Sequence, residues 1–430
     1  MVSAVDVPVA LLGYGTVGAA VNRFLQEGAD DIERATGHRL RVVRALVRDL
    51  DKERPFAAEP GVLTTRFEDV LEDPSIAVVA EVMGGLDPTA GYVLSLLRAG
   101  KPVVSANKQL VAQRGDELFA TASEGNVQLR FEASVCAAIP VVKVLRESLV
   151  VTNVHRILGI VNGTTNFILT EMERGAGYEE ALAEAQRLGY AEADPTDDVS
   201  GADAAAKMAI LATVAFGSRV ALADVAYVGI DTVRPEHVSA AEAQDMVVRL
   251  VGSASLVDGS VDVRVEPAFV DRHHPLAAVE GAFNAVVLEG DAIREITLEG
   301  PGAGGIETAS AVVADMVSVI GTTGTGFLQD DACWRELPFL PPGDLRCPYY
   351  LRVEVEDRPG VLALVAEGLA GHGVSIARLT QHLLDDGAAL DIVTHAAPTG
   401  EVADALEDIA ALGAVRGRPE ALRVVSERLV

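Results

Sequence analysis

Short apolar runs alternate with helical patterns through the first third of the chain. The first run, Val7–Leu12, ends at a glycine-rich turn and is followed by AAVNRFLQEG, whose apolar residues recur at helical spacing. Similar runs lie at residues 40–47, 76–83, 100–108 and 129–132, with a helical pattern at 90–99. Strands that alternate with helices are typical of a parallel sheet covered on both faces. We therefore predict an α/β fold that begins with a Rossmann-type, doubly wound nucleotide domain.

The pattern changes from about residue 150. A strand-like run at 154–161 ends at the polar sequence NGTTN and continues into a helix. Further β-like runs follow at 261–265, 285–288 and 292–298. This order predicts a second, α+β domain with a mixed sheet that helices cover on one side.

The last part of the chain is set off by four prolines between residues 338 and 348, which indicate a linker. Beyond it the pattern is strand, helix, strand, strand, helix, strand, the order of a ferredoxin-like module of about 80 residues. This module carries no catalytic constellation, so we expect a binding or regulatory unit. The predicted boundaries are 1–138 for the nucleotide domain, completed by a helix around 305–325, then 139–304 for the second domain, 326–348 for the linker and 349–430 for the module.

Composition restricts the class of partner and the setting. The formal net charge of -28 over 430 residues argues against nucleic acid or an anionic membrane surface as the main partner. Three cysteines, Cys136, Cys333 and Cys347, lack a CxxC spacing, which fits a reduced, cytoplasmic setting. No apolar segment approaches the roughly 20 residues that cross a bilayer, so we expect no membrane association.

The glycine-rich turn has the context of a dinucleotide fingerprint, because it lies between a strand and a helix. It comprises Gly13, Tyr14, Gly15, Thr16, Val17 and Gly18. Its glycines permit a tight turn and let backbone N–H groups approach a pyrophosphate at the helix N-terminus. A second glycine-rich segment, residues 300–305, opens another long helix and also permits close approach to a cofactor. A glycine-rich turn without a ligand remains the alternative for the first motif.

The second predicted strand ends in Arg48, which is followed by Asp49. In this fold the end of that strand reads the cofactor ribose. An arginine accommodates the 2′-phosphate of NADP, whereas an acidic residue favours the free hydroxyl of NAD. We therefore predict NADP, with use of both cofactors left open by Asp49.

The most distinctive stretch is Gly189–Phe216. Its acidic residues are Glu192, Asp194, Asp197, Asp198 and Asp203. Residues 204–216 are apolar on every face apart from Lys207, which predicts a buried helix with Ser200 as its N-cap. Asp203 and Lys207 are four residues apart and share a face. Burial lowers a lysine pKa, so we expect Lys207 to exchange a proton with a polar substrate whose amine and hydroxyl bind the carboxylates. A structural ion pair in a capped helix is the alternative.

Three other polar segments lie where strands end. Asn107 and Lys108 follow the fourth strand, and such ends face the ligand crevice of a doubly wound sheet. Glu132 follows the fifth, where one carboxylate and several carbonyls are able to hold a cation. Asn162–Asn166 open a helix whose free N–H groups and hydroxyls suit a carboxylate. A solvated lysine, a surface acid and a simple helix cap are the respective alternatives.

The motifs GYGTVG, SANK, NGTTNFIL, GYAEADPTDDVSGADAAAK and GPGAGG, in that order, resemble homoserine dehydrogenase, and the tail opening EDRPGV resembles an ACT domain. The resemblance covers essentially the whole chain. It implies interconversion of L-homoserine and L-aspartate 4-semialdehyde with NAD(P), in threonine, methionine and isoleucine biosynthesis. It also implies a homodimer or homotetramer assembled through the middle domain, and an ACT domain that senses an end product such as threonine.

The resemblance also implies roles for individual residues. Lys207 would donate and accept the proton at the substrate oxygen, and Lys108 would lie near that oxygen and the nicotinamide. The resemblance assigns Glu192, Asp198 and Asp203 to the substrate, and the polar helix opening described above adds Asn162, Gly163 and Thr164. The resemblance assigns Thr16, Val17, Arg48, Lys108 and Gly302 to the cofactor, and the glycine-rich turn adds Gly13, Gly15 and Gly18. A sodium ion would bind Glu132 and the carbonyls of Val135, Ala137 and Ile139.

One departure from the family pattern affects the cation site. The chain has Cys136-Ala137-Ala138 where the family usually has glycines, and alanine tolerates positive φ poorly. Two other functions also remain open: a non-catalytic amino-acid sensor on a dehydrogenase scaffold, and a dehydrogenase of another small amino acid. The presence of both Lys108 and Lys207 argues against the sensor, and a substrate panel separates the second dehydrogenase.

Overall fold

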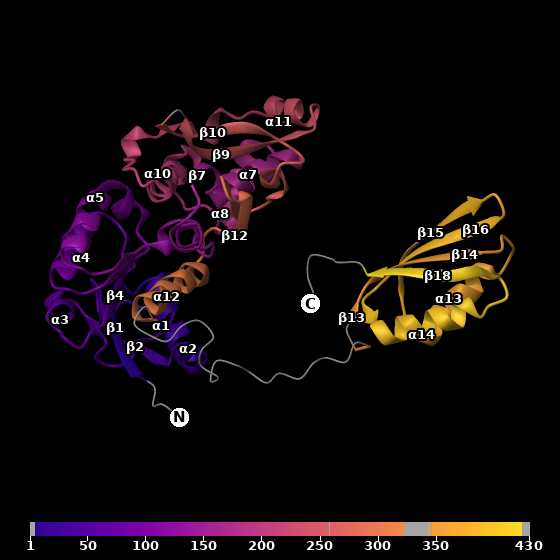
Figure 1. Ribbon diagram of the computed structural model, residues 1–430, viewed down its shortest axis with the longest axis horizontal. Coiled ribbons are helices and arrows are strands. Elements are labelled where there is room, and N and C mark those ends of the chain that lie inside the picture. Colours follow the sequence, from indigo (N-terminus) through magenta and orange to yellow (C-terminus); the bar gives the residue numbers. More distant parts are fainter. Residues whose placement is uncertain (1–4, 258, 322–342, 345, 424–430) are drawn as a thin grey trace. The chain divides into compact units, whose positions relative to one another are not determined.

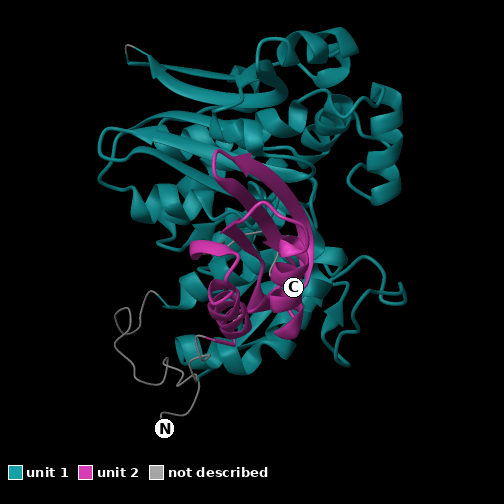
Figure 2. Cartoon of the chain, turned by 90° about the vertical axis from the view of Figure 1, so that its right-hand side faces the viewer, with its two compact units in different colours: residues 1–333 teal, residues 334–430 magenta. Residues whose placement is uncertain are grey.

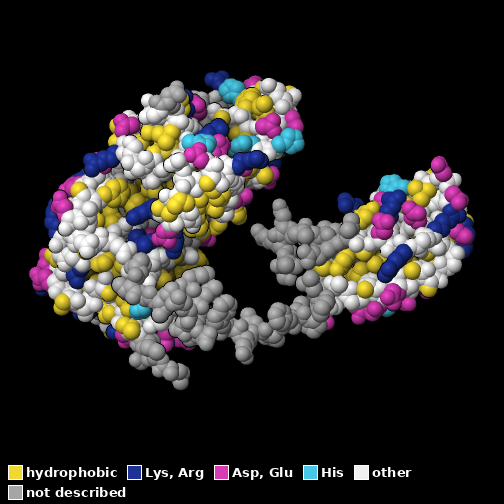
Figure 3. Space-filling view, viewed as in Figure 1, with side chains coloured by type: hydrophobic (Ala, Val, Ile, Leu, Met, Phe, Trp, Pro, Cys, Tyr) yellow, Lys and Arg dark blue, Asp and Glu magenta, His cyan; other side chains and the backbone are white. Residues whose placement is uncertain are grey.

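The computed structural model describes residues 5–257, 259–321, 343–344 and 346–423. The chain forms two compact units, residues 1–333 and 334–430 (Figure 2). Much of the predicted linker, the end of the predicted helix around 305–325, and Cys333 lie outside the described residues. None of the helices in the described ranges is long and apolar enough to cross a membrane. On the face in Figure 3, basic side chains alternate with acidic ones instead of gathering into a patch.

The first sheet has six parallel strands in the order β3-β2-β1-β4-β5-β6. They are β1 (Val5–Leu12), β2 (His38–Leu46), β3 (Leu63–Thr64), β4 (Val78–Glu81), β5 (Val103–Ser105) and β6 (Leu129–Arg130). The chain runs outward from β1 in both directions, which confirms the predicted doubly wound sheet. The ligand crevice of such a sheet lies at the carboxyl end of β1.

Helices cover both faces of this sheet (Figure 1). They are α1 (Thr16–Glu27), α2 (Ala29–Thr36), α3 (Glu68–Leu71), α4 (Thr89–Arg98), α5 (Lys108–Glu124) and α12 (Gly305–Gly321). Alternate side chains of β1 point to opposite faces. Val9 and Leu11 pack in one core with α1 and α12, whereas Ala10 and Leu12 pack in another with α4 and α5. Helix α12 thus returns from far along the chain to complete the nucleotide domain.

The second sheet has the order β12-β11-β7-β9-β10-β8, and only the β8–β10 pair is parallel. Its strands are β7 (Val154–Ile160), β8 (Ala226–Tyr227), β9 (Met246–Val257), β10 (Ser260–Asp271), β11 (Phe283–Gly290) and β12 (Arg294–Pro301). The helices of this region are α6 (Val141–Lys143), α7 (Gly163–Glu173), α8 (Tyr178–Leu188), α9 (Thr196–Val199), α10 (Ala202–Phe216) and α11 (Pro235–Glu242). Single helical turns occupy Glu132–Ser134, Val144–Ser148, Leu222–Asp224, Ile230–Thr232 and Pro275–Ala278. The predicted mixed sheet is confirmed.

Two local features differ from the predictions. Strand β9, with twelve residues, was not predicted, because Gly252 and its serine neighbours interrupt the apolar pattern. It forms by pairing along its whole length with β10, and a Cβ built at Gly252 would lie 2.5 Å from Met208 of α10. Ser200 is not the N-cap of α10, because the chain turns at Gly201, whose φ is 85°. Asp203 is therefore the second helical residue instead of the third.

The C-terminal unit has an antiparallel sheet in the order β15-β16-β14-β18. Its elements are β13 (Arg346–Cys347), β14 (Tyr349–Val355), α13 (Val361–Gly371), β15 (Ile376–Leu384), β16 (Gly387–Thr394), β17 (Ala397–Pro398), α14 (Thr399–Ala410) and β18 (Val415–Arg423). Both helices pack on one face of the sheet around a single apolar core (Figure 1). This arrangement confirms the predicted ferredoxin-like module.

Candidate active site

Helix α10 places Lys207 beside Asp203. The helix is buried on nearly all sides, and the Lys207 side chain is only 11% exposed. Its Nζ lies 2.8 Å from Asp203 Oδ2 and donates a hydrogen bond of 2.8 Å to the Val161 carbonyl. Val161 directly follows β7, so the lysine joins the buried helix to the end of a central strand of the second sheet.

Asp203 is the centre of this polar cluster, and its side chain is 2% exposed. Lys108, the first residue of α5, forms an ion pair with Asp203 Oδ1. The side-chain amide of Asn162 donates to Asp203 Oδ2 at 2.8 Å and to Asp198 Oδ1 at 2.7 Å. The cluster therefore joins the start of α5, the N-cap of α7, the short helix α9 and helix α10. Lys108 is an ion-paired residue and not simply a solvated one.

The pKa values of Asp203 and Lys207 depend on the opposite charges beside them as much as on burial. Burial alone would raise the pKa of Asp203, but the ammonium groups of Lys207 and Lys108 outweigh it and lower that pKa. Burial alone would lower the pKa of Lys207, but the nearby Asp203 carboxylate outweighs it and raises that pKa. The lowered lysine pKa predicted from the sequence is therefore wrong. The pKa of Asp198 is raised, chiefly by burial.

A cleft of about 950 Å³ opens beside these groups. The predicted site residues that line it are Lys108, Asn162, Gly163, Thr164, Glu192, Asp198, Asp203, Lys207 and Gly302. These are all the residues predicted to act on or bind the substrate, together with two predicted to contact the cofactor, Lys108 and Gly302. They come from the nucleotide domain and the second domain, which form one compact unit.

The sequence analysis missed several side chains of the cleft. They are Phe167, Arg174, Tyr190, Glu280, Phe283 and Glu307. Tyr190 had a local signal, because it directly precedes the acidic loop, and its carbonyl accepts a 2.6 Å hydrogen bond from Thr164 Oγ1. Its ring lies 5.1 Å from that of Phe167. Glu280 and Phe283 had no local signal, because only tertiary packing brings their loop to α7.

The glycine-rich turn joins β1 to α1. It contains the predicted cofactor residues Gly13, Gly15, Thr16, Val17 and Gly18. A Cβ built at Gly18 would lie 2.3 Å from the Gly13 carbonyl oxygen, so only glycine allows this close packing. Nothing lies within 4 Å of a Cβ built at Gly15, which leaves open space at the N-terminus of α1. A pyrophosphate fits such a turn. A Cβ built at Gly305 would lie 2.8 Å from Thr16 Cγ2, so the turn adjoins the start of α12.

Arg48 lies two residues after the end of β2 and is exposed. Within the described ranges its guanidinium has no ion pair. The neighbouring Asp49 accepts a 2.9 Å hydrogen bond from the Asp51 backbone N–H. The Leu46 carbonyl accepts a 3.0 Å hydrogen bond from the Gly13 N–H, so Arg48 follows a segment that is tied to the glycine-rich turn.

Glu132 is 5% exposed, so the surface-acid alternative is wrong. Its two carboxylate oxygens accept backbone hydrogen bonds from Val142 at 2.9 Å and Lys143 at 2.7 Å. Burial raises the pKa of Glu132 to about 7, and the neighbouring Asp315 carboxylate adds to the increase. Asp315 also accepts a 2.9 Å hydrogen bond from the Glu132 backbone N–H.

The segment after Glu132 adopts positive φ angles, which favour glycine, at two residues that are not glycine. Cys136 has φ 54° and Ala137 has φ 40°. No hydrogen bond among the described residues uses the carbonyls of Val135 and Ala137, whereas the Ile139 carbonyl accepts one of 2.8 Å from Val141. No group of three or more His, Cys, Asp or Glu side chains in the described ranges has the arrangement of a metal site. A cation here would therefore rely on backbone oxygens.

A doubly wound nucleotide sheet beside a cleft with a buried, ion-paired lysine is typical of nicotinamide-dependent dehydrogenases. Comparisons with known proteins narrow this class. The family models for the NAD-binding domain of homoserine dehydrogenase, for homoserine dehydrogenase and for the ACT domain match residues 13–132, 140–317 and 349–414. Homoserine dehydrogenase from Bacillus subtilis is 40% identical, with 97% of this chain and 98% of that protein covered. The chain belongs to the homoserine dehydrogenase family.

Solved structures support the same assignment. A homoserine dehydrogenase from Thiobacillus denitrificans is 40% identical, with a TM-score of 0.71 and coverage of 97% of this chain and 98% of that one. A mutant of a hyperthermophilic archaeal homoserine dehydrogenase, solved in complex with NADPH, is 31% identical with a TM-score of 0.62. That match covers 73% of this chain and 98% of the archaeal chain.

Proposed function

We propose that this chain catalyses the reversible oxidation of L-homoserine to L-aspartate 4-semialdehyde with NADP or NAD. One observation carries the proposal: the Lys207 ammonium is held by Asp203 in the cleft that Gly302 also lines. Gly302 lies just before α12, whose first residue packs against Thr16 of the glycine-rich turn. A proton-transfer group, carboxylates and a nucleotide-binding turn thus belong to one compact unit.

Lys207 is the group that acts on the substrate oxygen. A nicotinamide cofactor held at the glycine-rich turn and Gly302 would supply the hydride chemistry at the alcohol carbon. In aldehyde reduction the Lys207 ammonium donates a proton to the oxygen as negative charge develops there. In homoserine oxidation the neutral amine takes the hydroxyl proton. Because the raised pKa of Lys207 favours the ammonium, we expect homoserine oxidation to accelerate as the pH rises above neutral.

The carboxylates and the start of α7 recognise the amino-acid end of the substrate. Glu192, Asp198 and Asp203 supply negative charge for the α-amine. Gly163 and Thr164 are the first two residues of α7, where backbone N–H groups suit the α-carboxylate. Lys108, paired with Asp203, lies on the side of the cleft that belongs to the nucleotide domain.

Substitution of Lys207 by alanine tests the central role. We expect turnover to fall by about 10³-fold or more, with cofactor affinity unchanged, because the proton donor is lost while the glycine-rich turn is intact. Lys101→Met is the matched control, since Lys101 is also buried, but its partners among the described residues are the Asp73 and Ile76 carbonyls outside the cleft. Near-normal turnover of the alanine variant would refute the role of Lys207.

The wild-type protein tests the function itself against its two alternatives. Oxidation of homoserine with either cofactor supports the proposal. Binding of amino acids without any change in nicotinamide absorbance would indicate a sensor. Oxidation of a different small amino acid, with homoserine inert, would indicate another dehydrogenase.

We also propose that NADP is the preferred cofactor. Arg48 is exposed near the glycine-rich turn, where it is available to a 2′-phosphate. The archaeal relative was solved with NADPH. We expect Arg48→Ala to raise the KM for NADP about 10-fold, the loss of one charge-assisted contact, and to leave the KM for NAD nearly unchanged. An equal change in both KM values would contradict the assignment.

A sodium ion at Glu132 and the carbonyls of Val135, Ala137 and Ile139 is part of the proposal. Hard cations bind carboxylate and carbonyl oxygens, and two of these carbonyls take no hydrogen bond from the described residues. The departure from glycine does not prevent the turn, because Cys136 and Ala137 adopt positive φ. Replacing sodium with a bulky organic cation in the assay buffer tests the site.

Assembly and regulation complete the proposal. We expect a homodimer or homotetramer formed through the second domain, and control by threonine through the C-terminal ACT domain in a cytoplasmic enzyme. The ACT domain itself is present at residues 349–414. Light scattering gives the oligomer size, and a substrate panel with and without threonine tests the regulation.

A further inference from the structure

Two asparagines lie one turn apart at the start of α7. Asn162 is the N-cap: its Oδ1 accepts from the Thr165 N–H at 2.8 Å, while its Nδ2 reaches the carboxylates of the cleft. Asn166 is four residues further on, so it shares the helix face of Asn162, and it is fully buried. Asn162 therefore positions the carboxylates of Asp198 and Asp203 in the cleft. Asn166 has different partners on the same face of the helix.

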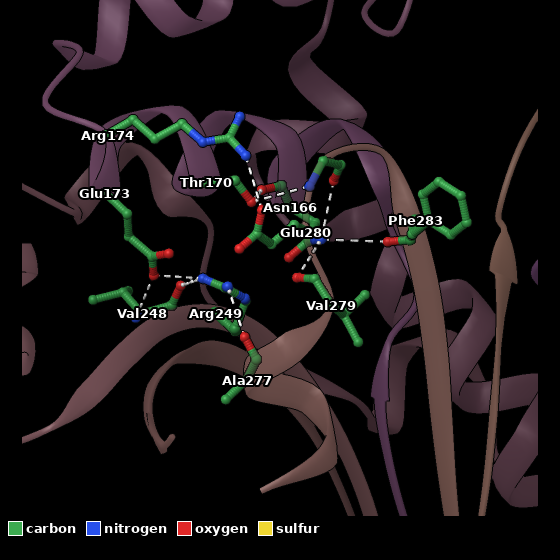
Figure 4. Close-up of polar contacts among 11 residues, drawn as sticks. Asn166, Thr170, Glu173, Arg174, Val248, Arg249, Ala277, Val279, Glu280 and Phe283 are labelled. Atoms are coloured by element: carbon green, nitrogen blue, oxygen red, sulfur yellow. Dashed lines mark hydrogen bonds and ion pairs between the residues drawn. The ribbon is translucent and has the colours of Figure 1, made fainter. Parts of the chain in front are cut away.

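Asn166 holds the loop 279–283, which ends at Phe283, the first residue of β11 (Figure 4). Its Nδ2 donates to the Val279 carbonyl at 3.1 Å and to the Gly281 carbonyl at 3.0 Å, and lies 3.4 Å from that of Phe283. Three carbonyls thus converge on one amide nitrogen. The Oδ1 of Asn166 has no hydrogen-bond partner among the described residues. The amide N–H groups of Asn166 therefore suit this position, because the loop groups that face them are all carbonyl oxygens.

Thr170, one turn further along α7, adds a second tie to the same loop. Its Oγ1 accepts a 3.2 Å hydrogen bond from the Gly281 N–H and donates one of 2.8 Å to the Asn166 carbonyl. The hydroxyl is buried, so each bond is sheltered from water. Gly281 is consequently held through both its N–H and its carbonyl by two side chains of one helix face.

The loop is a wall of the candidate active site. Residues 280–283 line the cleft. A Cβ built at Gly163 would lie 2.5 Å from the Ala282 carbonyl oxygen, so the loop backbone packs directly against the first residue of α7. A shift of the loop would change the space beside Gly163 and Thr164, where we place the substrate carboxylate.

We propose that Asn166 is a positioning residue for substrate binding, acting through the loop 279–283 with Thr170 as its auxiliary. This inference rests on the proposed function. The same helix face then sets two walls of the cleft: Asn162 orients the carboxylates, and Asn166 sets the loop that packs on Gly163. Neither Asn166 nor Thr170 lines the cleft, so their effect on substrate is indirect.

A neighbouring buried network provides the matched control. Arg249 forms an ion pair of 2.5 Å with Glu173 and donates to the Ala277 carbonyl at 3.1 Å (Figure 4). It anchors the chain just before the loop, at a point that does not line the cleft. Loss of this anchor is expected to lower the melting temperature without altering substrate affinity.

The test compares four variants of the full-length enzyme by steady-state kinetics and thermal unfolding. For Asn166→Ala we expect the KM for homoserine to rise about 10-fold, with kcat and the KM for NADP changed less than about threefold, because misplacement affects binding of the substrate and not the hydride acceptor. For Thr170→Val we expect a smaller rise in the KM for homoserine. For Thr170→Ser, which keeps the hydroxyl, we expect the KM for homoserine to equal the wild-type value. For Arg249→Lys we expect a lower melting temperature with an unchanged KM.

Several results would overturn the inference. One is an unchanged homoserine KM in folded Asn166→Ala and Thr170→Val; another is an equal KM increase in Arg249→Lys, which would indicate general destabilisation. If Asn166→Ala does not fold, the comparison of Thr170→Val with Thr170→Ser decides, and equal KM values in those two variants refute the inference. Failure of the wild-type enzyme to oxidise homoserine would refute the proposed function instead.

Discussion

Asp203 and Glu132 are two carboxyl groups buried to almost the same extent, yet their pKa values shift in opposite directions. Taken over the whole residue, Asp203 is 4% exposed and Glu132 is 5% exposed. The pKa of Asp203 is lowered, because two ammonium groups outweigh the effect of burial. The pKa of Glu132 is raised to about 7, because burial is opposed mainly by two backbone N–H groups and is reinforced by Asp315.

The difference shows that burial raises the pKa of a carboxyl group here unless ammonium groups lie against it, as they do at Asp203. A full positive charge at contact distance stabilises a carboxylate far more than the partial charges of peptide groups. Asp203 is therefore permanently ionised near neutral pH and able to orient Lys207. Glu132 has a charge that depends on pH or on a nearby cation, which is the behaviour expected of a cation ligand.

The largest expected effect follows from removing the charge of Asp203. In Asp203→Asn, Lys207 and Lys108 lose their shared carboxylate, so we expect turnover to fall by about 10³-fold. The pH at which homoserine oxidation begins should also decrease, because the pKa of Lys207 is no longer raised. Steady-state pH profiles measure both changes. Asp197→Asn, on the exposed rim of the cleft, should stay within about threefold of wild type, and an equal loss there would contradict a special role for Asp203.

A smaller, pH-dependent effect is expected at Glu132. Because its folded pKa is raised from 4.5 to about 7, the folded state binds the proton more tightly, and the wild-type protein loses stability as the pH rises between these values. The loss corresponds to about 3 kcal/mol. The unfolding free energy of Glu132→Gln should therefore increase relative to wild type by that order between pH 4.5 and pH 8 in sodium-free buffer.

Asp203 provides the contrast for this measurement. Its pKa is lowered, so its contribution to stability is present above the unfolded pKa near 3.8 and is lost only below it. The Asp203 carboxyl itself should thus add no pH dependence from pH 5 to pH 8, and any slope of Asp203→Asn relative to wild type over that interval comes from Lys207, whose pKa is no longer raised. A constant difference for Glu132→Gln over the same interval would show that the two carboxylates do not differ as described. Added sodium should reduce the Glu132 dependence if the ion binds there.

The smallest expected effect concerns the backbone after Glu132. Ala137 has φ 40°, and relief of this strain by glycine exceeds the added entropy of the unfolded chain only slightly. We expect Ala137→Gly to stabilise the protein by about 0.5 kcal/mol. Ala138→Gly, at an exposed residue without positive φ, should destabilise it by a similar amount. Chemical denaturation resolves the two signs, and destabilisation by both variants would contradict the strain at Ala137.

The parts of the fold that were predicted correctly are those with strong local patterns. The strands of the first sheet are short, nearly continuous apolar runs because helices cover both of their faces. Strand β9 was not predicted because its small residues interrupt the alternation of apolar and polar residues that marks a strand. These small residues are needed there because α10 packs closely against β9. The N-cap of α10 was misplaced because Gly201, with its positive φ, turns the chain there in place of Ser200.

The candidate site shows the same division. Residues within contiguous motifs, such as Asp198, Asp203 and Lys207, were identifiable because they are close in sequence and have the chemistry of proton transfer. Glu280 and Phe283 were not, because nothing near them along the chain indicates a cleft. The raised pKa of Lys207 also required the structure, since sequence spacing does not say how many carboxylates surround the ammonium.

The sequence by itself determined the order of the three folded regions, the glycine-rich turn and the buried helix with its single lysine, because each depends on residues that are neighbours along the chain. Only the tertiary structure decided that α7 holds the loop 279–283 and that Lys108 joins Lys207 on Asp203. These arrangements depend on long-range packing and on electrostatic interactions that weaken with distance in space and not with separation along the chain.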